Sequence, residues 1–152
     1  MLLKVEKLVK MYKMPILGEV AKELNCLLGV DIPRCVVIGN NVKFPHNLIG
    51  TVIHDKTVIE DNVKIYQNVT LGRADVYKAS KDANTEFEGF LIKEGACICA
   101  GAKLICKKGT LAVGKNAVVG ANAVLLNSIG ENEIWSGVPA KFIGMRDRAD
   151  QV

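Results

Sequence analysis

Residues 92–125 read IKEGACICAGAKLICKKGTLAVGKNAVVGANAVL, and a bulky apolar residue returns at every sixth position through most of this stretch. The same interval runs through the preceding sixty residues. The residues in phase are Ile32, Ile38, Phe44, Ile53, Ile59, Ile65, Leu71, Ile92, Ile98, Leu104, Val113, Val119 and Leu125. A helix cannot keep a period of six on one face, whereas a coil of short strands can. Hexapeptide repeats are typical of a parallel β-helix, and the period predicts that fold.

The composition agrees with one narrow β-rich domain. The chain has 152 residues, of which 49% are hydrophobic and only 5% aromatic. Its net charge of +4 is not gathered in a basic run, so we expect no nucleic-acid partner, although the charge suits a polyanionic cofactor. No apolar run is long enough for a membrane span, and no signal-peptide pattern opens the chain. We expect a cytoplasmic protein.

The cysteines predict neither a disulfide framework nor a metal site. Cys97 and Cys99 flank Ile98, so in a strand they share the face opposite to it. No second pair and no nearby histidine completes a zinc site. We expect reduced thiols.

The pattern divides the chain into a helical lead at 1–29, a coil of repeats at 30–144 and a polar tail at 145–152. Two helices are expected within the lead, separated before Pro15. The expected buried face of the first helix consists of Leu2, Leu3, Val5, Leu8, Val9 and Tyr12, and that of the second consists of Leu17, Val20, Ala21, Leu24, Leu27 and Leu28.

The six-residue interval is interrupted three times. Nine residues separate Phe44 from Ile53, twenty-one separate Leu71 from Ile92, and nine separate Leu104 from Val113. Insertions in repeat proteins map to loops, often at the binding face. The longest predicts a loop at 73–91, which is either a solvated surface loop or a functional one. The third interruption has no evident role in the sequence.

Several motifs resemble the serine acetyltransferase branch of the hexapeptide-repeat acyltransferases. They are Gly29-Val30-Asp31-Ile32-Pro33, Pro45-His46, Val63 to Gly72, Gly101-Ala102-Lys103 and Gly137-Val138-Pro139-Ala140-Lys141. The short helical lead resembles the short form of this branch, which accompanies surface-polysaccharide genes. The resemblance implies a left-handed parallel β-helix with three hexads per coil, a trimeric assembly and acetyl-CoA as the donor.

With three hexads per coil, Asp31 and His46 come to the same corner of the coil, in neighbouring turns. Strands stack at about 4.8 Å, which puts a hydrogen bond between the two side chains within reach. Gln67 follows Ile65 at the offset that His46 has after Phe44, so we expect it above His46. The other histidine, His54, is expected to point to the surface.

An Asp–His pair suits acyl transfer to a hydroxyl. Histidine, with a reference pKa of about 6.5, can take the hydroxyl proton as the oxygen attacks the thioester. Aspartate would hold the ring and stabilise the imidazolium. His46 and Asp31 are therefore the predicted catalytic residues.

The donor contacts follow from the resemblance. Pantetheine lies along coil edges in this family, and small residues permit that approach. Ala100, Gly101 and Ala102 match the pantetheine-contacting turn, and Ala121 lies in the next suitable turn. Lys141 matches the basic residue of the closing motif and is the candidate for the nucleotide phosphates.

The acceptor side departs from the family. Pro45 stands where the serine enzymes have an aspartate, and Glu88, Gly89 and Phe90 stand where they have Arg-His-Pro. We therefore expect a sugar hydroxyl of surface-polysaccharide biosynthesis as acceptor, with Gln67, Arg73 and Glu88 as candidate substrate contacts. The alternatives are serine O-acetylation for cysteine biosynthesis, or a non-catalytic trimeric scaffold. The resemblance implies a homotrimer, and because the long loop and His46 lie at different corners, we expect its sites to be shared between subunits.

Overall fold

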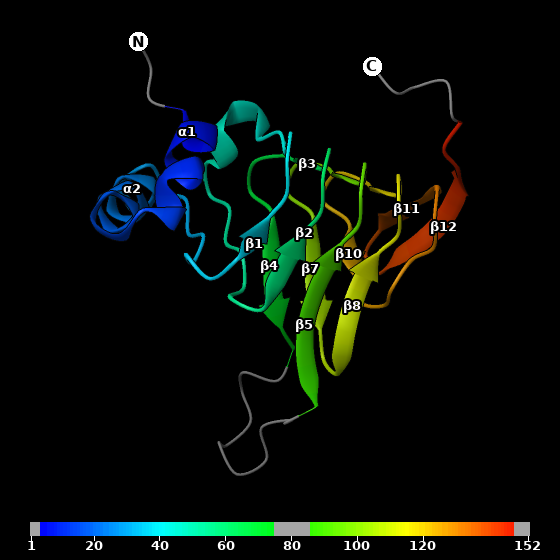
Figure 1. The fold of residues 1–152 in the computed structure, drawn as a ribbon. Coiled ribbons are helices and arrows are strands. Elements are labelled where there is room, and N and C mark those ends of the chain that lie inside the picture. The colour runs from blue at the N-terminus through cyan, green and yellow to red at the C-terminus, as the bar shows by residue number, and fades with distance from the viewer. Residues whose placement is uncertain (1–3, 75–85, 148–152) are drawn as a thin grey trace.

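The computed structural model describes residues 4–74 and 86–147, which form mainly short strands with two short helices at the N-terminal end (Figure 1). Leu2, Leu3, the middle of the predicted loop at 75–85 and the end of the polar tail at 148–152 lie outside the described residues. No helix within the described ranges is long and apolar enough to cross a membrane.

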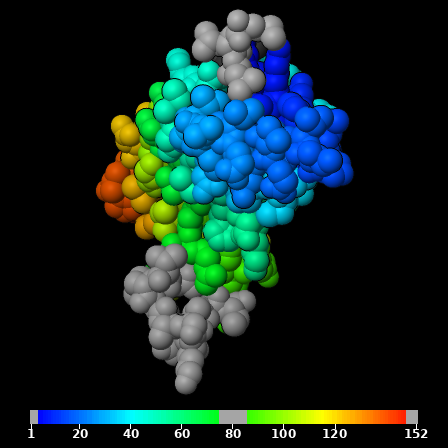
Figure 2. Space-filling view, turned by 90° about the vertical axis from the view of Figure 1, so that its left-hand side faces the viewer, coloured from blue at the N-terminus to red at the C-terminus, as the bar shows by residue number. Residues whose placement is uncertain are grey.

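The helical lead consists of α1 (Val5–Lys10), a 3₁₀ turn η1 (Met11–Lys13) and α2 (Pro15–Leu27). The described part of the predicted first stripe is confirmed, because Val5, Leu8, Val9 and Tyr12 are all buried. These helices lie against the first turns of the strand coil, as the blue and cyan surfaces of Figure 2 show. Glu6 ties α1 to the coil by accepting a hydrogen bond of 3.1 Å from the Phe44 N–H.

The predicted buried face of α2 is wrong for four of its six residues: Leu17, Val20, Leu27 and Leu28 are exposed. The helix instead buries Gly18, Ala21 and Asn25. Gly18 lies so close to the Tyr12 carbonyl oxygen that an added Cβ would collide with it. The buried Asn25 amide donates a 2.7 Å hydrogen bond to the Tyr12 hydroxyl. Close approach and this hydrogen bond therefore decide which face of α2 turns inward.

The strands form three sheets, through which the chain passes in a fixed order. The first sheet contains β4 (Thr70–Arg73), β7 (Lys103–Cys106) and β10 (Val124–Leu125). The second contains β1 (Val37–Ile38), β2 (Thr57–Ile59), β5 (Phe87–Ile92) and β8 (Gly109–Val113). The third contains β3 (Lys64–Ile65), β6 (Cys97–Ile98), β9 (Val118–Val119), β11 (Glu133–Gly137) and β12 (Ala140–Met145). Every pairing is parallel except that of β11 with β12.

The registers stack the predicted in-phase residues into three columns. Ile38, Ile59, Ile92 and Val113 are successive partners in the second sheet. Bridges from Asp31 to Val52 and from Val52 to Thr70 align the Ile32, Ile53 and Leu71 positions in the first sheet. A bridge from Lys43 to Lys64 does the same for Phe44 and Ile65 in the third. Twelve of the thirteen in-phase residues are buried, and the other, Ile38, is partly buried against them, so the six-residue period describes the core.

The second and third interruptions lie on top of one another. β4 and β7 continue beyond the hexad as far as the pair Arg73 and Cys106, and β5 and β8 begin at the pair Phe87 and Gly109. The predicted loop at 73–91 is therefore too long, since its last five residues are strand. Lys108 makes a 2.6 Å ion pair with Glu86, and the Gly109 N–H donates to the Glu86 carbonyl at 2.7 Å. The residues of the third interruption therefore bind Glu86, at the end of the second interruption where the chain enters β5.

The corners of the coil are held by stacked turns in which an asparagine lies over a glycine. Gly50, Gly95 and Gly101 all have positive φ, and an added Cβ would collide with the amide of Asn68, Asn116 and Asn122 respectively. Asparagine tolerates the left-handed conformation, and glycine gives room for its side chain. In these three pairs, the glycine of one turn therefore leaves room for the asparagine amide of the turn stacked on it.

We expect Gly95→Ala to destabilise the fold more than Gly109→Ala does. Gly109 also has positive φ, at 63°, but nothing lies within 4 Å of an added Cβ. Gly109→Ala should lower the free energy of unfolding by about 1–2 kcal/mol, the cost of a left-handed L-residue. Gly95→Ala should lose a further ~1–3 kcal/mol from crowding against Asn116. Urea unfolding of the two variants measures the difference, and equal losses would contradict the steric account.

Candidate functional site

His46 lies in the first interruption, within the turn η2 (Pro45–Leu48), whose backbone is not helical at His46 and Asn47, between the third and first sheets. Its side chain is exposed, and its ring centroid lies 6.3 Å from that of Tyr66. Tyr66 is a site neighbour that sequence reasoning missed, although it directly follows the in-phase residue Ile65. The predicted corner position of His46 is therefore observed.

The backbone at His46 is strained. His46, Asn47 and Leu48 have φ of 55°, 53° and 51°, three consecutive non-glycine residues in the left-handed region. Such residues cost roughly 1–2 kcal/mol each and persist only where the surroundings hold them. The anchor is Leu48, which is completely buried and whose carbonyl accepts a 2.9 Å hydrogen bond from the Thr51 N–H. Strain of this kind gathers at functional sites.

Asp31 lies in the same region but is not hydrogen-bonded to His46 in the described part of the chain. Its backbone pairs with Val52, donating to the Thr51 carbonyl and accepting from the Ile53 N–H, each at 2.9 Å. Its side chain is exposed, like that of His46. The Asp–His hydrogen bond expected from ideal stacking is thus not formed between these two side chains. The catalytic roles of the two residues stay predictions.

Gln67 lies one residue beyond Tyr66, at the same corner. Its side-chain carbonyl oxygen, Oε1, is buried and accepts no hydrogen bond from the described residues. Its backbone carbonyl accepts a 2.9 Å hydrogen bond from the Gly101 N–H. A buried acceptor without a donor is unfavourable unless a ligand or water supplies one, so Gln67 is a candidate ligand contact.

The predicted cofactor-binding turns stack on the Gln67 turn at the same corner, in the later coils. The Asn122 N–H donates to the Ala100 carbonyl at 2.9 Å, which places the turn at Ala121 over the turn at Gly101. Ala100 and Gly101 are partly exposed and Ala121 is exposed, so a ligand can approach them. Ala102 is completely buried, and its predicted place in a turn that contacts pantetheine stays a prediction. It occupies the small inward position of its hexad.

Lys141 is exposed at the start of β12 and lines a hollow of about 540 Å³ at the C-terminal end of the coil. The other lining residues are Leu125, Leu126, Asn127, Trp135, Pro139, Ala140 and Phe142. An apolar hollow with one cation suits a nucleotide, and the cofactor role of Lys141 stays a prediction.

Cys97 and Cys99 project from the outer face of β6, as expected, while Ile98 is fully buried. The hydrogen bond between the two thiols, with Arg146 and Lys64 nearby, lowers the pKa of Cys97 to about 7 against the opposing effect of burial. The same hydrogen bond and burial raise the pKa of Cys99. All five cysteines are free, and no group of three potential metal-ligating side chains occurs among the described residues.

The opposite corner, between the first and second sheets, differs from expectation at His54. Its side chain is only 22% exposed and packs edge-on against Phe87, with the ring centroids 4.8 Å apart. Arg73, a predicted substrate contact, lies over the same ring with its Cζ 5.2 Å from the centroid. His54 is therefore partly covered rather than fully exposed, because Phe87 packs against it.

Glu88, the other predicted substrate contact at this corner, is exposed and accepts a 2.9 Å hydrogen bond from Thr110. Gly89 follows at a β-bulge with φ of 146°, where an added Cβ would collide with the Lys56 carbonyl. A histidine cannot replace glycine there without moving the backbone. The backbone of this chain therefore requires the glycine at position 89.

Comparisons with known proteins agree on one group. The serine acetyltransferase of Haemophilus influenzae is 37% identical over 127 residues, which are 84% of this chain and 43% of that protein. That of Escherichia coli is 36% identical over 125 residues, 82% of this chain and 42% of that protein. The chain thus spans less than half the length of these curated relatives. No family model matches it.

Solved structures give the same result. A serine acetyltransferase in complex with cysteine is 32% identical with a TM-score of 0.74, covering 95% of this chain and 55% of that one. The Brucella abortus serine acetyltransferase in complex with coenzyme A is 28% identical with a TM-score of 0.72, covering 94% and 54%. The resemblance to hexapeptide-repeat acyltransferases is confirmed. Within them, the chain is similar to the serine acetyltransferases.

Proposed function

We propose that the chain forms an acetyl-CoA-dependent O-acetyltransferase site with His46 as the general base. The observation that carries the proposal is an exposed histidine, held in a strained left-handed turn, beside the stacked small-residue turns of Gly101 and Ala121. The similarity to serine acetyltransferases, one of them in complex with coenzyme A, supports the donor.

In the proposed reaction, the His46 imidazole takes the proton of the acceptor hydroxyl as its oxygen attacks the thioester carbonyl carbon. The C–S bond then breaks, and the imidazolium returns the proton to the departing CoA sulfur. Asp31 would stabilise the imidazolium once the acceptor and donor draw the two side chains together. Gln67 Oε1 would accept a hydrogen bond from the bound donor or acceptor.

Serine is the acceptor that the comparisons support. The relatives found are serine acetyltransferases, and nothing among them supports the sugar hydroxyl expected from the sequence. The alternative expectation, serine O-acetylation, is therefore our proposal. The replacement of the family's arginine by Glu88 is the observation that keeps a sugar acceptor as the second candidate.

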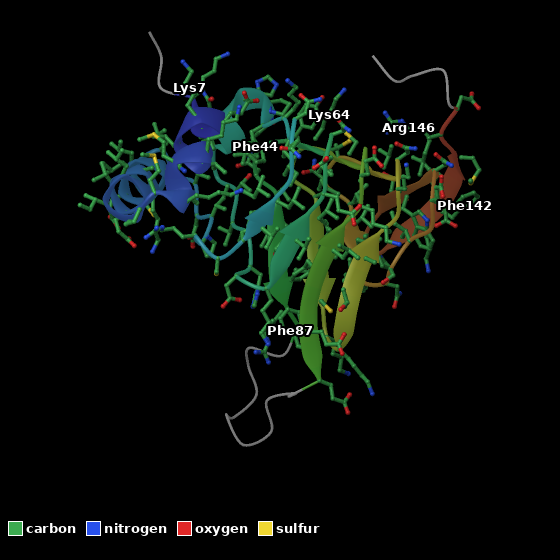
Figure 3. The ribbon with its side chains drawn as sticks, viewed as in Figure 1. Lys7, Phe44, Lys64, Phe87, Phe142 and Arg146 are labelled. Atoms are coloured by element: carbon green, nitrogen blue, oxygen red, sulfur yellow. The ribbon has the colours of Figure 1, made fainter. Side chains whose placement is uncertain are left out.

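The proposal includes a left-handed coil that assembles as a homotrimer with shared sites. The TM-scores of 0.74 and 0.72 to serine acetyltransferases support the coil. The apolar face of α2 supports assembly, since Ile16 and Leu27 are 81% and 83% exposed. Figure 3 shows Phe44 toward the upper end of the strands and Phe87 toward their lower end, so these two residues of one chain lie on different sides of it. Five free cysteines fit the reducing cytoplasm.

An acceptor panel tests this function. Loss of acetyl-CoA thioester absorbance is followed with L-serine, with free and nucleotide-linked sugars, and with no acceptor. We expect turnover with serine at kcat/KM on the order of 10⁴ M⁻¹s⁻¹ or above, and only background hydrolysis without acceptor. Turnover with sugars alone would replace serine by the second candidate. Absence of turnover together with absence of CoA binding would favour a scaffold.

A further inference from the structure

We propose that Cys97 and Cys99 form a reversible thiol–disulfide site for small anionic disulfides, in which Cys97 is the attacking thiol and Cys99 the resolving thiol. The inference does not depend on the proposed acetyltransferase function. It rests on the placement of the two thiols of β6, on the two cations beside them and on their partial exposure on the outer face of the third sheet.

The two thiols lie close together on the outer face of β6. Ile98 between them is completely buried, so the cysteine side chains on either side of it point outward, where both are partly exposed. The side chains of Cys97 and Cys99 are hydrogen-bonded to one another. Residues two apart in a strand have Cα atoms about 6.6 Å apart, inside the usual disulfide range of about 4.4–6.8 Å. A disulfide between the two cysteines therefore requires little movement of the backbone.

Two cations lie near Cys97. Lys64 is its register partner in the neighbouring strand β3. Arg146 is anchored near the start of β6, because its Nη1 donates to the Gly95 and Asn116 carbonyls at 3.2 and 3.1 Å. Figure 3 shows Lys64 and Arg146 at the same upper edge of the strands. Positive charge at this place stabilises a thiolate and attracts a reagent that carries negative charge.

The surroundings of Cys97 favour its thiolate form. The hydrogen bond with Cys99 lowers the pKa of Cys97, burial opposes this effect, and Arg146 and Lys64 lower it further, to about 7. A thiol with the ordinary pKa of about 8.5 is only about 3% ionised at pH 7, whereas a thiol with a pKa of about 7 is about half ionised. The thiolate is the form that attacks a disulfide, which makes Cys97 the attacking sulfur.

The exchange takes place in two steps. In the first, the Cys97 thiolate attacks one sulfur of the small disulfide, whose S–S bond breaks, and the other half leaves as a thiolate that takes a proton from water. In the second, Cys99 loses its proton to solvent and its sulfur attacks the Cys97 sulfur, so that the remaining half leaves as a thiolate and is protonated. Two protein thiols are thereby oxidised to a disulfide, and one small disulfide is reduced to two thiols.

Cys99 becomes reactive once Cys97 has reacted. The hydrogen bond with Cys97, burial and the negative charge of Cys97 all raise the pKa of Cys99. The Cys97 sulfur of a mixed disulfide carries no charge, so two of these three causes disappear after the first step. Cys99 then ionises more readily beside the sulfur that it attacks. The order of the two steps is therefore determined by the pair itself.

The dithiol adjoins the candidate site at the His46 corner. Tyr66, whose ring centroid is 6.3 Å from that of His46, lies alongside Cys99, because the Tyr66 N–H donates to the Ile98 carbonyl at 3.0 Å. Ala100, in the turn predicted to contact pantetheine, directly follows Cys99. A substituent on either thiol therefore lies next to the surface where the donor is proposed to bind.

The test follows each cysteine of the full chain by mass spectrometry. The reduced protein is treated with glutathione disulfide at pH 7, the exchange is stopped with acid at successive times, and the peptides report which thiol has reacted. We expect Cys97 to react about 3- to 10-fold faster than Cys26, because its larger thiolate fraction is partly offset by the lower nucleophilicity of a more acidic thiol. Cys26, in α2, is the reference because it is the more exposed of the two. In concentrated urea the two rates should become equal.

The charge preference is tested with cystamine, a disulfide that carries positive charge. The ratio of the Cys97 rate to the Cys26 rate should be about threefold or more higher with glutathione disulfide than with cystamine. Arg146→Ala should reduce this difference. Lys93→Ala, which removes an exposed cation that follows β5, should leave it unchanged.

The resolving step is tested with Cys99→Ser. In the wild-type chain the glutathionyl group should leave Cys97 as the internal disulfide forms, whereas in Cys99→Ser it should stay bound. Equal rates at Cys97 and Cys26 in the folded chain would overturn the attacking role of Cys97. A glutathionyl group that stays on Cys97 in the wild-type chain would overturn the resolving role of Cys99, and equal rate ratios with the two reagents would overturn the preference for anionic disulfides.

Discussion

His46→Ala should lower kcat by about 10²–10⁴-fold at saturating serine and acetyl-CoA, the usual contribution of a general base. The chain should remain folded, because the His46 side chain is exposed and the buried anchor of its turn is Leu48. Thioester loss measures kcat, and circular dichroism and sedimentation check the fold and assembly. Lys93→Ala, at an exposed position away from both corners, is the control for a surface truncation.

His46→Gly tests the strain of the turn as well as the loss of the imidazole, which His46→Ala does not. Glycine adopts the left-handed conformation without strain, so this variant should lose the same activity and yet unfold at higher urea, with a gain of roughly 1 kcal/mol. A gain in stability with loss of turnover would identify the histidine as retained for function at the expense of the fold. Turnover near that of the wild type in either variant would reject His46 as the base.

Combining two inactive variants in mixed trimers should restore about a third of wild-type activity if each site combines two subunits of a symmetric trimer. The parents are His46→Ala and Arg73→Glu, which alter opposite corners of the coil. In every mixed trimer, whichever variant is present twice, a wild-type His46 meets a wild-type Arg73 at one of the three interfaces. Co-expression with two affinity tags and double purification yields the mixed trimers, which are assayed at low serine concentration.

Co-expression of His46→Ala with Asp31→Asn is the matched control. Both substitutions lie at the same corner of the coil, so no arrangement of subunits reunites the two wild-type side chains, and activity should stay at that of the parents. If mixed trimers of His46→Ala and Arg73→Glu stay inactive, the site is not shared between subunits. A wild-type monomer with full turnover would do so as well.

The core of this protein was predictable because one physical constraint repeats. Each hexad buries its bulky residue and its small fifth residue, so Ile59 and Ile92 stack whatever occupies the turns between them. Interruptions do not disturb this register, since the parallel pairings resume after each of them. The hexad count therefore predicts Asp31, His46 and Gln67 at one corner of the coil.

What the sequence could not predict depends on contacts between interruptions. His54 has the pattern of a surface residue until Phe87 covers it, and Phe87 lies more than thirty residues away. The Asp31–His46 hydrogen bond expected from ideal stacking is not formed, and the three consecutive left-handed residues at His46, Asn47 and Leu48 were not foreseen. The buried face of α2 follows Gly18 and Asn25, which hydrophobicity does not reveal. Each of these three features depends on a local backbone conformation or a long-range contact that the six-residue pattern does not encode.

The reversal of direction between β11 and β12 has a consequence for solubility. A stack of parallel strands ends in unpaired N–H and C=O groups, which can template the addition of another chain. In the third sheet, β12 covers that edge in the opposite direction, with register irregularity between Ile134 and Trp135. The strand that then faces outward carries Lys141 near its start and is followed by Arg146. An incoming parallel strand would meet a mismatched polarity and a charged border, which makes the hairpin a barrier to end-to-end fibre growth.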